Sequence, residues 1–358
     1  MHPKLAAACA AIPEPQTDDD ELRIATARGL LHGYHARWIN EEWAVEAVER
    51  EFAVPIVNPA THRRSLNFVH AGKFDGLIAR NGDGYLLEHK TCSEDVSPGS
   101  PYWRRLAIDA QVSGYLLASW LLGRKLTGVL YDVIRKPEIR PKKLGLADTA
   151  AVRRTSQYCG RMLSPETFQR FLLDKEYRET PEMFEARLAQ DTLERSDWYF
   201  GRQVITRLDR ELLTYAQELW QTAQDVHRAM ATEDRRRNAG ACYLFHRPCE
   251  YLDLCAGHAR PESGRFISLP TLHPELEELH HDGSRVLTHT RLSTFALCRR
   301  KHHYRYGLGI STADTSEALT FGSLFHEALA AWWQTESGDG SREAPEAHDR
   351  DRAHTPAA

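Results

Sequence analysis

A short stretch of the sequence carries two carboxylates and a lysine inside an apolar pattern. The segment GKFDGLIARNGDGYLLEHKT (72–91) has two apolar runs separated by Asn-Gly-Asp-Gly, the kind of turn that most strongly signals a β-hairpin. Residues two apart in a strand share a face, so Glu88 and Lys90 project together. In a hairpin closed near 81–84, Asp75 lies across from the Glu88 end. The pattern therefore predicts that the three side chains converge.

Two carboxylates at one place repel each other unless a cation lies between them, and hard carboxylate oxygens suit Mg²⁺ or Mn²⁺. A lysine beside such an ion can orient an attacking water or stabilise charge that develops on a phosphate. The alternative is an edge hairpin with a surface Glu–Lys pair. The upstream position of Asp75 and the apolar run before Glu88 favour the metal site.

The surrounding segments indicate an α/β protein. Hydrophobic periodicity predicts helices at 20–40 and 103–122, strands at 43–56 and 128–136, and helix throughout 181–232. In the 103–122 helix, Gln111 and Tyr115 are four residues apart and so share a face, where an amide and a phenol could contact the site.

Three pieces of this text, FDG, YLLEHKT and QVSGY, together resemble the PD-(D/E)XK nuclease superfamily, in particular its RecB-like branch. The resemblance implies a restriction-endonuclease-like central mixed sheet flanked by helices. It also implies that Asp75 and Glu88 bind the divalent metal, that Lys90 assists the water, and that Gln111 and Tyr115 support the site. The segment FGSLFHEAL (321–329) is similar to the first active-site motif of the same branch, which would make His326 a further metal ligand. Without the resemblance, His326 is an ordinary half-buried helical histidine.

A cysteine cluster suggests a second metal group. Cys242, Cys249 and Cys255 are separated by six and five residues, whereas zinc pairs usually have two to four intervening residues. Four thiolates usually hold an iron–sulfur cluster. The fourth candidate, Cys298, lies in LSTFALCRRKHHYRYGLG, which is similar to the opening of the iron–sulfur members of the branch, as in AddB-type and CRISPR-associated nuclease domains. The resemblance implies a structural 4Fe–4S cluster in a helical, Cys-rich subregion, with Zn²⁺ as the alternative.

The motifs occur in a rotated order. In the family, the Cys-bearing start and the Gly-x-x-x-His helix come first, whereas here they come last. We therefore expect a circularly permuted single nuclease domain. A tandem fragment or a domain-swapped dimer would use the same contacts in trans. The expected segments are a flexible lead-in (1–20), a nuclease core (20–260) with its Cys-rich part (234–260), a linker (261–285), a helical segment that completes the domain (286–335), and a disordered tail (336–358).

Bulk properties set further limits. The chain has 358 residues, 42% hydrophobic and 27% charged, with a net charge of −4, which predicts a soluble globular protein without a global basic field. No apolar run is long enough for a membrane span. Local basic and aromatic residues suit a single nucleic-acid strand. These candidates are Arg299, Arg300, Lys301, Tyr304 and Arg305.

The resemblance implies a metal-dependent DNA nuclease, most simply a single-strand-acting exonuclease in recombination, repair, or phage or CRISPR DNA processing. The expected partners are single-stranded DNA or DNA ends and a separate helicase or recombination protein, since the sequence has no Gly-x-x-x-x-Gly-Lys-Ser/Thr loop. The expected location is the cytoplasm, in a bacterial or phage-encoded setting. The rival function is a non-catalytic single-stranded-DNA-binding or scaffold subunit with a four-cysteine metal staple.

Overall fold

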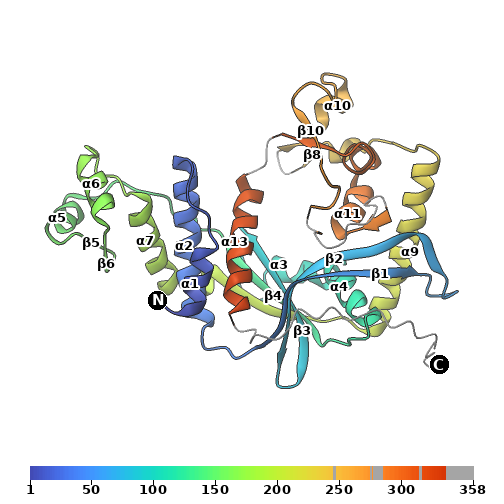
Figure 1. Ribbon diagram of the computed structural model, residues 1–358, viewed down its shortest axis with the longest axis horizontal. Coiled ribbons are helices and arrows are strands. Elements are labelled where there is room, and N and C mark those ends of the chain that lie inside the picture. Colours follow the sequence, from blue (N-terminus) through green and yellow to red (C-terminus); the bar gives the residue numbers. More distant parts are fainter. Residues whose placement is uncertain (245–246, 275, 277–284, 314–316, 336–358) are drawn as a thin grey trace.

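The computed structural model describes residues 1–244, 247–274, 276, 285–313 and 317–335 (Figure 1). The expected tail, 336–358, and part of the expected linker, 261–285, lie outside the described residues. Within the described part of the chain, no helix combines the length and the apolarity that a membrane crossing requires.

A mixed sheet forms the centre of the molecule. Its strand order is β1-β2-β3-β4-β7, and β11 pairs with β2. The β3–β4 and β11–β2 pairs are parallel and the others are antiparallel. The strands are β1 (Ala44–Val57), β2 (Arg64–Arg80), β3 (Asp83–Cys92), β4 (Gly128–Arg135), β7 (Phe200–Ile205) and β11 (Val286–Leu287). This sheet and its flanking helices confirm the predicted fold class and are consistent with a restriction-endonuclease-like fold.

Helices cover both faces of the sheet (Figure 1). Apolar residues of α1 (Pro3–Ala10), α2 (Asp18–Trp38) and α13 (Glu317–Gln334) form one core with one face of the strands. Residues of α3 (Pro101–Arg105) and α4 (Ala110–Leu121) form the core on the other face. The long helix α9 (Asp209–Ala231) packs against α4 and β1.

A buried polar network joins α2 and α13 to the sheet. The Asp132 carboxylate on β4 accepts hydrogen bonds from Tyr34 (2.6 Å) and Arg202 (3.0 Å), and its Oδ2 lies 3.1 Å from His89 Nδ1. Trp333 Nε1 of α13 donates to the Tyr34 hydroxyl at 3.1 Å. Asp132 is fully buried, and these partners at Oδ2 replace part of the hydration that the charge has lost, whereas Oδ1 has no hydrogen-bond partner among the described residues.

A side lobe projects from the sheet between β4 and β7 (Figure 1). Its helix α7 (Pro181–Glu194) packs closely against α2. The closeness is clear at Gly33 of α2, where an added Cβ would lie only 2.3 Å from Thr192 Oγ1 of α7. The lobe contains α5 (Leu146–Thr155), β5 (Gln157–Tyr158), β6 (Arg161–Met162), α6 (Pro165–Leu173), α7 (Pro181–Glu194) and α8 (Ser196–Tyr199).

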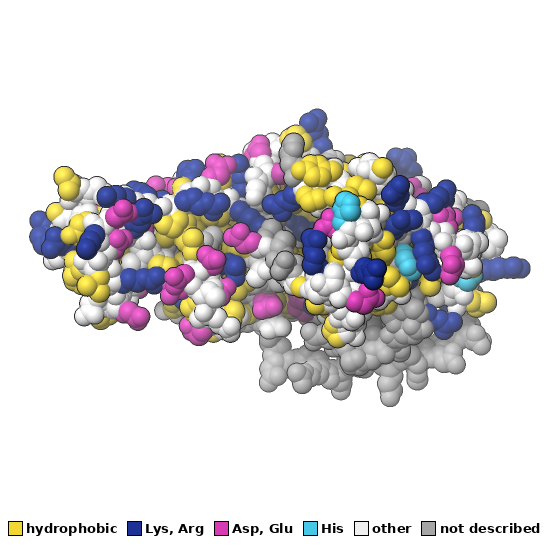
Figure 2. Space-filling view, turned by 90° about the horizontal axis from the view of Figure 1, so that it is seen from above, with side chains coloured by type: hydrophobic (Ala, Val, Ile, Leu, Met, Phe, Trp, Pro, Cys, Tyr) yellow, Lys and Arg dark blue, Asp and Glu magenta, His cyan; other side chains and the backbone are white. Residues whose placement is uncertain are grey.

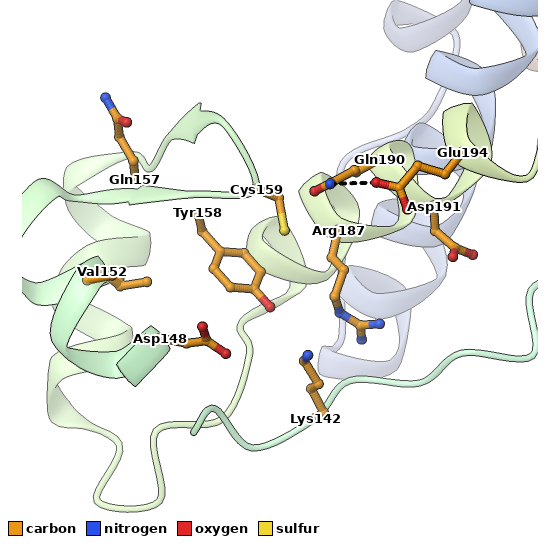
Figure 3. Close-up of a pocket in the computed structure, with 11 residues that line it drawn as sticks. Lys142, Asp148, Val152, Gln157, Tyr158, Cys159, Arg187, Gln190, Asp191 and Glu194 are labelled. Carbon is orange, nitrogen blue, oxygen red and sulfur yellow. Dashed lines mark hydrogen bonds between the residues drawn. The ribbon is translucent and has the colours of Figure 1, made fainter. Parts of the chain in front are cut away.

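Figure 3 shows a polar pocket of about 450 Å³ in this lobe, with Tyr158, Cys159 and Arg187 among its lining residues. The Arg187 guanidinium is already bound to Glu179, and none of the predicted site residues lines the pocket.

The cysteine lobe, which we define as residues 234–268 and 298–312, consists of short elements. They are a 3-10 turn (Ala239–Ala241), β8 (Tyr243–Leu244), β9 (Arg247–Pro248), α10 (Leu252–Ala256), β10 (Phe266–Ser268), α12 (Arg299–His302), a π-helical turn (His303–Gly307) and β12 (Ile310–Thr312). The adjoining α11 (His289–Leu297) leads into it from β11.

The structure differs from the expected segments in three places. The expected continuous helix at 181–232 is interrupted by β7, whose residues 200–205 pair with β4. The 103–122 helix is broken before Ala110, where Asp109 caps α4 by accepting from the Val112 N–H. The expected lead-in contains a helix, α1, which packs against α13 and buries Leu5 and Ala8.

Removing the Asp132 carboxylate should destabilise the protein strongly. Asp132→Ala removes the fully buried partner of the Arg202 guanidinium, which then keeps, among the described residues, only its ion pair with Glu41, and breaking a buried pair in this way typically costs about 3–5 kcal/mol. Urea unfolding followed by circular dichroism measures this change. The control is Asp197→Ala, which breaks an exposed pair with Arg37 and should change stability little. Equal unfolding midpoints for the two variants would contradict the role of the network.

Candidate metal centre

The two predicted carboxylates lie where two strands separate. Antiparallel pairing of β2 with β3 runs from the Arg80–Asp83 end to Gly76 and Leu87 and stops there, while β3 continues alongside β4. Asp75 and Glu88 are the next residues on each strand, and both are buried. The hairpin itself closes through Asn81 and Gly82, which have φ values of +55° and +86°. That two-residue turn confirms the hairpin prediction.

The C-terminal helix α13 brings His326 to the place where β2 and β3 separate, at Asp75 and Glu88, which we call the fork. His326 Nε2 lies 2.9 Å from Asp75 Oδ2, and the same oxygen accepts a hydrogen bond of 2.7 Å from the backbone N–H of His89. A Cβ on Gly322 would lie 3.8 Å from Thr91 Oγ1, so α13 passes close to the end of β3. Residues 251 positions apart therefore meet within one chain.

Glu49 joins this pair, and the sequence reasoning missed it. Its Oε1 lies 3.7 Å from His326 Nδ1 and its Oε2 lies 2.5 Å from Lys73 Nζ. Ligand atoms of Glu49, Asp75 and His326 all lie within 4.8 Å of one another, a geometry that could hold a metal ion.

The backbone of Glu49 is strained, and its place in the sheet explains why it was missed. Glu49 has a φ of +54°, a left-handed conformation that costs a non-glycine residue about 1–2 kcal/mol. Residues 48 and 50 pair with Gly76 and Phe74, so Glu49 lies opposite Asp75. Its neighbours Glu46 and Glu51 look the same in the sequence, and only this register separates Glu49 from them.

Glu88 and Lys90 form the second part of the site. Their side chains make an ion pair, and the Lys90 side chain is 35% exposed while Glu88 is buried. Among the described residues, Glu88 Oε2 is buried without a hydrogen-bond partner. Burial, reinforced by the charge of Asp75, raises the pKa of Glu88 to about 7, and Lys90 opposes this change. The pKa of Lys90 is raised by Glu88 although burial works against it.

The charges of the first group support one another. Burial alone would lower the pKa of His326, yet Asp75 and Glu49 raise it to about 10. Burial works against ionisation of Asp75, but His326 lowers the pKa of Asp75 overall. The imidazolium of His326 thus lies between the two carboxylates as a counter-charge.

Gln111 and Tyr115 contact the strand that carries Asp75. Gln111 Nε2 donates to the Tyr115 hydroxyl at 2.9 Å, and that hydroxyl donates to the Lys73 carbonyl, also at 2.9 Å. Lys73 precedes Asp75 by two residues on β2. These hydrogen bonds of Gln111 and Tyr115 therefore brace the backbone beside Asp75.

The four predicted cluster cysteines lie in one lobe. They are half-buried free thiols, and Cys255 interacts electrostatically with Cys242 and Cys298, and Cys249 with Cys255. The backbone N–H of Asn238 donates to Cys298 Sγ at 3.4 Å. In the part of the chain that the structure describes, no three of these sulfurs lie within 4.8 Å of one another.

The predicted nucleic-acid residues are largely engaged inside the lobe. Arg299 pairs with Asp234, Lys301 pairs with Glu250 at 3.0 Å, and Arg300 Nε donates to the Arg235 carbonyl at 2.9 Å. The remaining two are also half-buried: Tyr304 lies 4.0 Å from Cys255 Sγ, and Arg305 lies 3.5 Å from Ser311 Oγ.

Comparison with known proteins gives one match. A family model of the PD-(D/E)XK nuclease superfamily matches residues 286–357, about a fifth of the chain. The match includes Cys298 and His326 and does not reach the hairpin with Asp75. No curated protein and no solved structure matches the chain. Nucleases of this superfamily generally use Mg²⁺ or Mn²⁺, so the match indicates a metal-dependent nuclease and agrees with the acidic group at the fork.

Replacing Glu49 should alter both protonation and metal binding. In the metal-free Glu49→Gln protein, the pKa of His326 should fall because one of its two carboxylates is lost, and NMR of the imidazole Cε1–H measures it. Calorimetric affinity for Mn²⁺ should fall by roughly tenfold or more. The control is Glu46→Gln on the same strand, whose carboxylate pairs with Arg124. An unchanged pKa and affinity in Glu49→Gln would exclude Glu49 from the site.

Proposed function

We propose that the protein is a metal-dependent deoxyribonuclease of the RecB-like branch that degrades single-stranded DNA from an end. The observation that carries this proposal is the meeting of Glu49, Asp75 and His326, from three separate elements, beside the Glu88–Lys90 pair. The family match and the mixed sheet support the same reaction class.

The residues at the fork suit Mg²⁺ or Mn²⁺. Carboxylate oxygens are the ligands that both ions prefer, and a single imidazole is compatible with Mn²⁺. Glu49, Asp75 and His326 would hold one ion, and Glu88, with its unpartnered buried oxygen, would complete that site or hold a second ion. When bound, the metal would activate water and stabilise charge on the phosphate.

The chain's own groups prepare the site for hydrolysis. Lys90 is held by Glu88 yet remains partly exposed, so its ammonium can hold the attacking water and face a phosphate oxygen. Gln111 and Tyr115 fix the Lys73 carbonyl and with it the direction of β2 at Asp75. The raised pKa of Glu88 makes this carboxylate able to exchange a proton near neutral pH when no metal is bound.

We also propose that the domain is circularly permuted. The supporting fact is that α13, which follows the cysteine lobe in sequence, packs against β1, β3, α1 and α2 of the same chain. A domain-swapped dimer would make the same contacts between chains. The domain has no nucleotide-binding loop, so a helicase or recombination partner would supply unwinding in recombination, repair, or phage or CRISPR DNA processing.

The four cysteines of the lobe are proposed to hold a 4Fe–4S cluster with a structural role. The donor set is four thiols, and the Asn238 N–H bonded to Cys298 is the type of hydrogen bond that tunes such sulfurs. The alternative is Zn²⁺ held by the same four cysteines.

Nuclease activity should require Lys90. The monomeric fraction of the wild-type protein should degrade end-labelled single-stranded DNA in Mn²⁺, and faster than duplex DNA. Lys90→Ala should lower the rate by roughly 10²–10³-fold, because it removes a positioned donor. DNA binding should persist. The control is Lys125→Ala, an exposed lysine paired with Asp209, which should leave the rate unchanged. Degradation at the wild-type rate by Lys90→Ala would refute the assignment.

The cluster should be visible in the purified protein. Protein prepared without oxygen should be brown, absorb at about 400 nm and contain about four iron atoms per chain. Cys298→Ser should lose the colour, whereas Cys159→Ser in the side lobe should keep it. A colourless wild-type protein with one bound zinc would decide for the alternative metal.

A further inference from the structure

Two segments about 60 residues apart form one surface of the cysteine lobe. The backbone N–H of Arg300 donates to the Arg236 carbonyl at 3.2 Å, and Arg300 Nε donates to the Arg235 carbonyl at 2.9 Å. Asn238 Nδ2 donates to the Leu297 carbonyl at 2.9 Å. The loop that follows α9 is thus fixed against the start of α12.

This surface has an excess of positive charge. We call it the arginine surface, and it consists of Arg235, Arg236, Arg237, Arg299 and Arg300. The carboxylates beside it are Glu233 and Asp234, and Asp234 is shared between two of the arginines. The pair between Arg235 and Glu233 is largely exposed, and Arg237 has no ion pair among the described residues. Such exposed pairs contribute little and leave the guanidinium groups available to a stronger anion.

Seen from above, Lys and Arg side chains lie along the whole length of the molecule, including the part that holds this lobe (Figure 2). Next to the arginine surface, Tyr243 is 62% exposed and Arg247 is also exposed on the short β8–β9 hairpin. The sulfur of Cys242, the residue before Tyr243, lies 3.6 Å from the Asn238 carbonyl oxygen, so this hairpin adjoins the arginine surface. Guanidinium groups with an exposed ring match the phosphates and bases of a single strand.

Helix α11 connects this surface to the metal centre. Its first residue, His289, interacts electrostatically with Asp109 and Lys90, and the helix packs against α4, which carries Gln111 and Tyr115. Its C-terminal end leads directly into Cys298 and Arg299. Nine helical residues span about 13 Å. The distance from Lys90 to the start of the arginine surface is therefore short enough for a few nucleotides of a single strand to span it.

We propose that the arginine surface binds the phosphate backbone of a single DNA strand whose end lies at the metal centre. This inference rests on the proposed function and names how the site holds its substrate. It also reassigns the binding role. Within the arginine surface, Arg299 and Arg300 hold the two segments together, and the exposed Arg235 and Arg237 face the strand. Lys301 and Arg305 serve the packing of the lobe. Cationic groups without a base-reading pattern predict binding without sequence preference.

The test measures binding without hydrolysis. Fluorescein-labelled oligothymidylate is titrated with the full chain in metal-free buffer at several salt concentrations. The double variant Arg235→Gln/Arg237→Gln should bind roughly tenfold or more weakly at low salt. Its slope of log K against log salt should be shallower by about 1.4, since each phosphate contact on a single strand contributes about 0.7. The charge-preserving variant Arg235→Lys/Arg237→Lys should retain most of the affinity and shows that the loop still folds.

The matched control removes two exposed arginines from the side lobe. Arg153→Gln/Arg154→Gln has the same change in net charge and should bind as the wild type does. Unchanged binding by the Arg235/Arg237 glutamine variant, or equal losses in both glutamine variants, would overturn the inference.

Mn²⁺-dependent hydrolysis of the same oligonucleotide by the wild type separates the two proposals. Hydrolysis with no loss of binding in the variant rejects the arginine surface alone. If the wild type does not hydrolyse the oligonucleotide and the variant still loses binding, the nuclease proposal is rejected and the arginine surface is kept.

Discussion

The arrangement of this protein depends on carboxylates that are buried next to one another where two strands separate. Asp75 and Glu88 have lost most of their hydration, and neither could remain ionised there without positive charge nearby. His326 and Lys90 supply that charge, one to each carboxylate. The two cations are not equivalent, because the imidazole of His326 can release its proton and offer a lone pair, whereas Lys90 remains an ammonium. In the proposed metal centre, a divalent ion would replace the proton on His326 without disturbing Lys90.

The site at the fork is complete only when α13 packs against the sheet, and much of the hydrophobic core holds α13 in that position. Trp332 and Trp333 are almost fully buried between α1, α2 and the sheet, and their indole N–H groups donate to His35 and Tyr34. Tyr34 in turn donates a hydrogen bond to Asp132 of β4. Asp132 lies beside His89, which is the residue between Glu88 and Lys90 on β3. The helix that carries His326 is thus fixed through the opposite face of the same strand. Helix α1, although short, covers α13 and so helps to hold His326 in place.

Local sequence was sufficient for the hairpin, its turn and the convergence of Asp75 with Glu88, because alternation and Asn-Gly chemistry act over a few residues. It was insufficient for β7, whose six residues lie between two helical patterns and become a strand only because β4 offers an open edge. It was also insufficient for Glu49. In sequence this residue is one of several glutamates in a charged strand, and only the register with β2 and a left-handed backbone distinguish it. The family resemblance located His326, which spacing alone would have left as an ordinary helical histidine.

The cysteine lobe has little core of its own, so its internal bonds determine what it can present. Its strands are two or three residues long and its hydrophobic cluster has three buried side chains, Tyr251, Phe266 and Ile310. A small unit of this kind needs a covalent or metal staple to hold its shape. The cysteines lie on both segments that the arginine surface joins, 242–255 on one side and 298 on the other. A cluster bound by them would fix the relative position of those segments, and through α11 it would fix the distance from the guanidinium groups to Lys90. A group far from the chemistry can in this way determine where along a strand the chemistry occurs.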